Sequence, residues 1–135
     1  MFEIFVHRGG TVDWRGNLYE ADGTTPIVLA ATDKIRIKIG RGDQVAAPDL
    51  DILSGTATAN SSSVTINNVG VAATTAAQYT LRLAQADTAL LTGPVYEGLV
   101  AVVDDSETAP ADAFIVVEYF VLHVLPALAG SKGLT

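Results

Sequence analysis

The chain has 135 residues, of which 49% are hydrophobic and 17% charged, with a formal net charge of −7; this length suits one domain around one apolar core. The acidic charge disfavours nucleic acid as a partner, because phosphate binding needs clustered lysine and arginine, and the absence of cysteine excludes disulfides and thiolate chemistry. No apolar run is long enough for a membrane-spanning helix, and the first residues carry no secretory signal, so we expect synthesis in a cytoplasm and no membrane partner.

Apolar residues recur mainly with a period of two, which is the spacing of half-buried strands. In chain order, this pattern predicts strands at residues 2–7, 14–20, 33–40, 50–57, 62–67, 78–84, 95–103 and 113–124. Turn residues such as Asp22 and Gly23 separate them at the short spacing typical of sandwiches and barrels. Only Gln85–Thr92 has a helical pattern, as one short turn capped by Asp87. The sequence therefore predicts an all-β antiparallel sandwich with one short helical turn.

The strand at residues 33–40 has the most regular alternation. Its three isoleucines lie on one face, which we expect in the core. The opposite face bears a basic stripe formed by Lys34, Arg36 and Lys38. We expect this stripe to face an acidic surface of a partner protein.

The last predicted strand is apolar on both faces and about twice the usual strand length. A single small sandwich does not hide that much apolar surface, which indicates contact with a further subunit. We therefore expect a homo-oligomer whose interface contains Phe120, Leu122, Val124 and Leu125. On this reading residues 1–125 form the sandwich domain, and residues 126–135 form a C-terminal tail that lies against a neighbouring subunit.

The chain has no pattern that indicates catalysis, a cofactor or a transition-metal site. Its two histidines, His7 and His123, stand at no recognised ligand spacing. None of its serines sits in a nucleophile elbow. Asp49 and Asp51 point to the same side of a strand start, where they either bind calcium together with loop carbonyls or form a solvated loop edge. We therefore predict a protein that is not an enzyme.

Five aromatic residues leave one alternative function open. They are Trp14, Tyr19, Tyr79, Tyr96 and Tyr119. Aromatic residues in strands usually pack in the core with their polar tips at its rim, but together they can also form a platform on which sugars stack. A carbohydrate-binding or adhesive β-sandwich module is therefore the alternative to a purely structural role.

Two segments resemble the N-terminal domain of phage baseplate upper proteins. The first, WRGNLYEADGTTPI at residues 14–27, is followed by the alternating IRIK at residues 35–38. The second spans residues 79–104: the strand and turn YTLRLAQADTALL, a glycine, and the strand YEGLVAVVD, which ends in aspartate. The resemblance covers roughly residues 14–121.

This resemblance implies an immunoglobulin-like β-sandwich that is built into a bacteriophage virion. The chain departs from the family in two ways, because it has no long second domain and begins with an additional apolar strand, Phe2–Val6. A tail or baseplate component and a capsid decoration (cement) protein are therefore both consistent with the resemblance. Either role implies synthesis in the host cytoplasm, location in the virion, and binding to copies of the chain and to major capsid or tail proteins.

Overall fold

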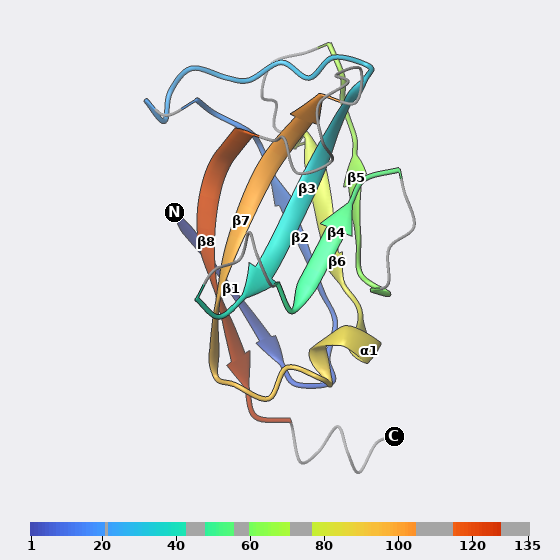
Figure 1. The fold of residues 1–135 in the computed structure, drawn as a ribbon, viewed down its shortest axis with the longest axis vertical. Helices are drawn as coiled ribbons and strands as arrows, with labels where there is room; N and C mark the ends of the chain where they lie inside the picture. The colour runs from blue at the N-terminus through green and yellow to red at the C-terminus, as the bar shows by residue number, and fades with distance from the viewer. Residues whose placement is uncertain (21, 43–47, 56–59, 71–76, 105–114, 128–135) are drawn as a thin grey trace.

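The computed structural model describes residues 1–20, 22–42, 48–55, 60–70, 77–104 and 115–127 (Figure 1). In chain order its elements are β1 (Phe2–His7), β2 (Val12–Gly16), β3 (Asp33–Gly40), β4 (Leu50–Leu53), β5 (Ser63–Ile66), β6 (Tyr79–Leu83), α1 (Gln85–Thr88), β7 (Val95–Asp104) and β8 (Ile115–Leu125). Each of the eight predicted strands corresponds to one of these, and the strands at residues 2–7 and 33–40 have the predicted bounds.

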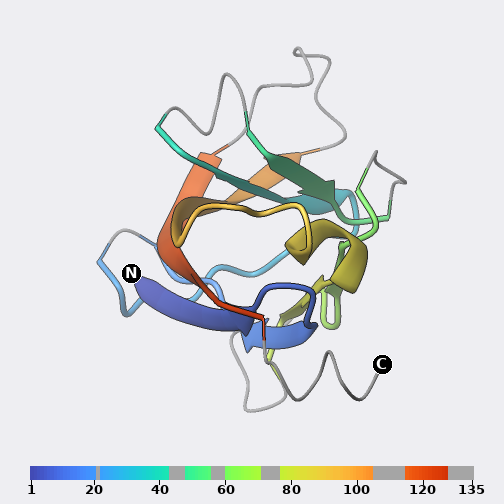
Figure 2. The same cartoon turned by 90° about the horizontal axis from the view of Figure 1, so that it is seen from below.

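The strands form two sheets that pack face to face (Figure 2). One sheet has five strands in the order β1-β8-β7-β3-β4, and the other has three in the order β2-β6-β5. The predicted all-β sandwich is confirmed. Neighbouring strands are antiparallel with one exception, because β1 runs parallel to β8, with Phe2 opposite Phe120. The larger sheet is therefore mixed rather than antiparallel throughout.

The inner faces of the two sheets form the core. All three isoleucines of β3 are fully buried there, as predicted, together with Leu81 and Leu83 of β6. A column of stacked rings joins the sheets at one side of the core. The Phe2 ring centroid lies 4.7 Å from that of Trp14 on β2 and 4.9 Å from that of Phe120 on β8. We call Trp14, Phe2 and Phe120 the aromatic column.

A glycine on β7 makes room for the end of this column. Gly98 is opposite Phe120 in the sheet register. A Cβ atom at residue 98 would lie 2.2 Å from Phe120 Cζ, which is far inside the van der Waals distance. The Phe120 ring therefore lies directly over the Gly98 backbone, and only glycine fits beneath it.

A buried glutamine fixes the long connection between β2 and β3. Gln78 Oε1 accepts a hydrogen bond from Leu18 N (2.8 Å), and its Nε2 donates to Ile27 O (2.7 Å). The sequence predicted that this strand extends to Glu20. The two hydrogen bonds of Gln78 explain why β2 ends at Gly16 instead. Beyond Gly16 the chain bonds to a side chain instead of a strand, and Tyr19 forms only an isolated bridge with Pro26.

The helical segment also differs from its prediction. α1 ends at Thr88 and is preceded by Ala84, which makes no side-chain capping bond. Asp87 is buried, and its carboxylate accepts hydrogen bonds from Ser62 N (2.6 Å) and from the Ser62 hydroxyl. This carboxylate therefore ties α1 to the residues just before β5 instead of capping its own helix.

We predict that Gly98→Ala destabilises the fold by about 1–3 kcal/mol, because the added methyl group overpacks the core against Phe120. Urea denaturation of both chains measures the change. The companion variant is Phe120→Leu, alone and combined with Gly98→Ala. Removing the ring relieves the clash, so the two effects should be non-additive by about 0.5–3 kcal/mol. Strictly additive effects would show that the ring is not the cause.

Candidate functional site

The outer face of the five-stranded sheet exposes apolar side chains at its β1 side. Phe5, His123 and Val95 lie in one row across β1, β8 and β7. The Phe5 and His123 rings are stacked, with centroids 4.4 Å apart. Phe5 is 56% exposed and Val95 47% exposed. Two further exposed side chains of β8, Tyr119 and Leu125, extend this row along the strand.

We call Phe5, Val95, Tyr119, His123 and Leu125 the outer patch. Polar contacts of the two histidines hold β1 and β8 together. His123 Nε2 lies 2.8 Å from Glu3 Oε1, and His7 Nδ1 lies 2.9 Å from the carbonyl oxygen of Pro126. The patch is therefore a fixed surface of neighbouring strands rather than a set of scattered exposed residues.

The structure corrects most of the predicted oligomer interface. Phe120, Leu122 and Val124 are at most 4% exposed and lie in the core of their own chain, so they do not face a second subunit. Only Leu125, which is 36% exposed, is at the surface. β8 lies between β1 and β7 in the large sheet, with its inner face in the core and its outer face partly exposed. Residues 128–135 of the predicted tail are outside the described residues.

The face of β8 opposite to the predicted interface is the exposed one. The alternate residues on the opposite face, Tyr119 and His123, belong to the outer patch. Phe5 was not among the predicted surface residues, although the period-two pattern of residues 2–7 separates it from Ile4 and Val6, which are buried.

The basic stripe lies on the same outer face but is partly incorporated into the sheet. Lys38 is only 4% exposed, so the prediction that it faces a partner is wrong. Arg36 forms a two-pronged ion pair with Asp51 of β4, with Nε–Oδ1 at 2.9 Å and Nη2–Oδ2 at 2.7 Å. Lys34 is half-buried.

The same ion pair bears on the predicted calcium site. Both carboxylate oxygens of Asp51 accept hydrogen bonds from Arg36, whose guanidinium lowers the pKa of this carboxyl below its ordinary value. Asp51 is thus neutralised by a side chain rather than left for a cation with Asp49. Among the residues that the structure describes, no group of three or more histidine or acidic side chains could hold a metal ion.

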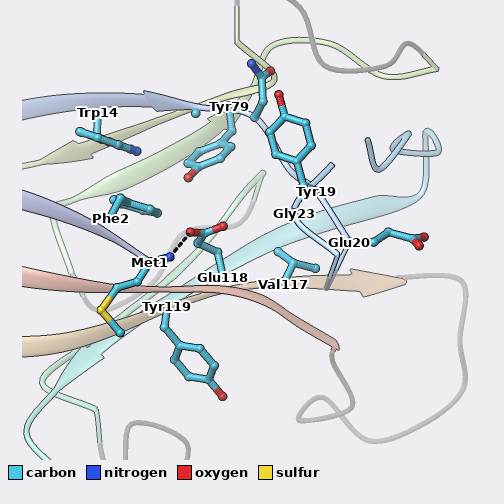
Figure 3. Close-up of a pocket in the computed structure, with 12 residues that line it drawn as sticks. Met1, Phe2, Trp14, Tyr19, Glu20, Gly23, Tyr79, Val117, Glu118 and Tyr119 are labelled. Atoms are coloured by element: carbon cyan, nitrogen blue, oxygen red, sulfur yellow. Dashed lines mark ion pairs between the residues drawn. The ribbon is translucent and has the colours of Figure 1, made fainter. Parts of the chain in front are cut away.

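Four of the five aromatic residues named above line one cavity at an end of the sandwich. Trp14, Tyr19, Tyr79 and Tyr119 surround about 600 Å³, with Glu118 among the lining residues. Figure 3 shows the Tyr79 hydroxyl pointing toward Glu118, and the Tyr119 ring pointing away from the cavity. Glu118 Oε1 lies 3.1 Å from the amino group of Met1. We call this space the end cavity.

The end cavity is polar at its centre and aromatic at its walls. Burial raises the pKa of the Tyr79 hydroxyl, which therefore stays protonated as a donor. Trp14 Nε1 points toward Tyr79 (Figure 3); it is buried, and among the described residues it meets no acceptor with hydrogen-bond geometry. One face of the Trp14 ring is covered by Phe2. The fifth aromatic, Tyr96, is buried elsewhere, where its hydroxyl accepts a hydrogen bond from Gly93 N at 2.8 Å.

The Arg36–Asp51 pair predicts a pH dependence of stability. The pKa of Asp51 is lowered in the folded state, so the ionised carboxylate stabilises the fold at pH values above the ordinary carboxyl pKa of 3.8. This contribution is lost as the pH falls through the lower folded value. Compared with Asp51→Asn, the native chain should therefore unfold at higher urea concentration at pH 7, and the difference should shrink below about pH 3.8. A difference that is constant from pH 7 to pH 2 would contradict the ion pair.

No helix in the described part of the chain is long and apolar enough to cross a membrane. Comparison with protein-family models, with curated proteins and with solved structures finds no match to this chain.

Proposed function

We propose that this chain is a structural protein of a bacteriophage virion, as a capsid decoration protein or a tail or baseplate component. On this proposal it works by binding copies of itself and other virion proteins, without catalysis. The resemblance of residues 14–27 and 79–104 to phage baseplate upper proteins supports the virion assignment. The outer patch supports the mode of action.

The strand order supports the immunoglobulin-like form of the sandwich. In that fold one sheet contains strands B, E and D, and the other contains G, F and C with C′ beside C. The orders β2-β6-β5 and β8-β7-β3-β4 follow this arrangement. Tyr96, at the start of β7, bonds back to the backbone at Gly93, as the tyrosine at the start of strand F does in that fold.

The observation that carries the proposal is the exposure of apolar side chains on three neighbouring strands of one sheet face. Single exposed apolar residues are common and need no explanation, but a contiguous apolar surface on a folded chain marks a contact site. Here Phe5, Val95 and Tyr119 are each about half exposed or more and belong to three neighbouring strands. A broad sheet face of this kind suits another protein surface better than it suits a small molecule.

We predict that Tyr119→Asp reduces incorporation of the chain into phage particles at least tenfold without unfolding it. The ring is 54% exposed, so its loss removes contact surface but little core packing. The measurement is the amount of chain in purified particles of the phage that encodes it. Leu90→Asp is the matched control, because Leu90 is 77% exposed and lies outside the patch.

Normal incorporation of Tyr119→Asp would show that the outer patch is not the contact surface. Complete absence of the native chain from purified particles would overturn the virion assignment itself.

A second candidate function is carbohydrate binding in the end cavity. It is favoured by the convergence of Trp14, Tyr79 and Glu118, because sugar sites combine aromatic walls with a few hydrogen-bonding groups. Trp14 is the sole tryptophan of the chain, so its fluorescence reports on this cavity. Titration with a panel of mono- and oligosaccharides should then change the emission saturably, and Glu118→Gln should weaken the response. A flat response to every sugar would eliminate this candidate.

A further inference from the structure

Apart from the charge of Glu3, the free edge of β1 lacks the features that usually protect the edge of a sheet. Edge strands are normally short, charged, kinked or interrupted by proline, because an exposed edge readily pairs with another strand. The edge strands β4 and β5 have only four residues each, and β2 exposes Asp13 and Arg15. β1 has six residues, FEIFVH, with no proline or lysine. Within the described residues it pairs only with β8.

The backbone groups of alternate β1 residues point to this edge. Arg8 N donates to Leu125 O at 2.9 Å, which fixes the direction of the ladder with β8. Because peptide direction alternates along a strand, Ile4 and Val6 also bond toward β8. Glu3, Phe5 and His7 therefore direct their N–H and C=O groups away from it. The bond from Gly10 N to His7 O (2.8 Å) lies on this side, as expected.

The side chains of Glu3, Phe5 and His7 are self-complementary when two copies of β1 run antiparallel. Glu3 and His7 stand two residues on either side of Phe5. If a second copy of β1 pairs with Phe5 opposite Phe5, each Glu3 comes opposite His7 of the other copy. Only this register pairs all three outward-directed residues: Phe5 exchanges two backbone hydrogen bonds with its copy, and His7 N donates to Glu3 O, while His7 O already accepts from Gly10 N. The side chains are accessible, since Phe5 is 56% and the Glu3 side chain 58% exposed.

The polar atoms also leave room for the second copy. His7 bonds the Pro126 carbonyl through Nδ1, so its Nε2 is on the far side of the ring. Glu3 contacts His123 through Oε1 and has a second carboxylate oxygen. A shallow cavity of about 310 Å³ runs along Phe5–Thr11 at this end of β1.

We propose that the chain forms a two-fold homodimer in which the β1 strands of two copies pair antiparallel about Phe5. The two five-stranded sheets then join into one continuous sheet. This inference rests on the proposed function, because it supplies the self-association that an assembly protein requires. The partner is a second copy of the chain because the outward-directed residues Glu3, Phe5 and His7 complement the same residues in reverse order.

Light scattering after size-exclusion chromatography of the full chain tests the proposal. We expect twice the mass of one chain for the native protein. Phe5→Arg places two cations together at the two-fold axis and should give a single-chain mass, with a dissociation constant raised at least 100-fold. Leu90→Arg is the matched control, because Leu90 is 77% exposed but lies outside both the outer patch and β1. It should remain a dimer.

Two further measurements test the pairing of β1 independently of how well the arginine variants fold. Amide hydrogen exchange of the native chain should slow with rising protein concentration at Glu3, Phe5 and His7, whereas Ile4 and Val6 should be protected at every concentration. His7→Glu should weaken the dimer at least tenfold, because it opposes Glu3 of the second copy. Adding Glu3→His to that variant exchanges the two partners and should restore the association.

A native chain that is monomeric at every concentration overturns the proposal, as does a dimer that survives Phe5→Arg. Equal loss of the dimer in both arginine variants, without alternating amide protection, also overturns it, since that result shows that the loss does not depend on the β1 edge. If the native chain is monomeric while Tyr119→Asp still fails to enter particles, the dimer is refuted and the proposed function stands.

Discussion

The aromatic column is the interaction on which the rest of the molecule depends. Phe2 lies between Trp14 of the small sheet and Phe120 of the large sheet, so one ring fastens β1 to both layers. Stacked rings contribute about 0.5–1.5 kcal/mol per pair beyond the burial of their surface. This contribution adds to the ladder between β1 and β8 and to the burial of Ile4 and Val6 in the core. The outer patch and the free edge exist only while this strand is in place.

The architecture could be predicted from the sequence wherever neighbouring residues alone decide the structure. β1 and β3 were located correctly because alternation of apolar and polar residues depends only on which face of a strand is buried. The end of β2 was not, because Gln78, some sixty residues away, bonds to Leu18 and replaces the ladder there. Asp87 likewise has the residue type and position of a helix cap, yet its partner Ser62 belongs to a distant segment.

The candidate site was harder to predict because it depends on which strands are neighbours. Residues 113–124 showed two apolar faces, and nothing local indicates which of them faces the core. The three-stranded sheet that packs over one face of β8 decides that. The prediction that the basic stripe faces a partner was wrong for the same reason. The register of β3 with β4 brings Asp51 next to Arg36 and Lys38, and neither strand alone determines that register. The aromatic residues were recognised as a set, but their shared cavity was not.

The strict alternation along β1 has an evolutionary consequence. Even-numbered residues hold the interior and odd-numbered residues meet the outside, one after the other. Inserting or deleting one residue within the strand would exchange these duties and turn Phe5 inward and Ile4 outward. A change of length within this segment is therefore excluded more strictly than a replacement that keeps the alternation. Chains of common descent should keep the same spacing between Phe2 and the glycine pair at residues 9 and 10.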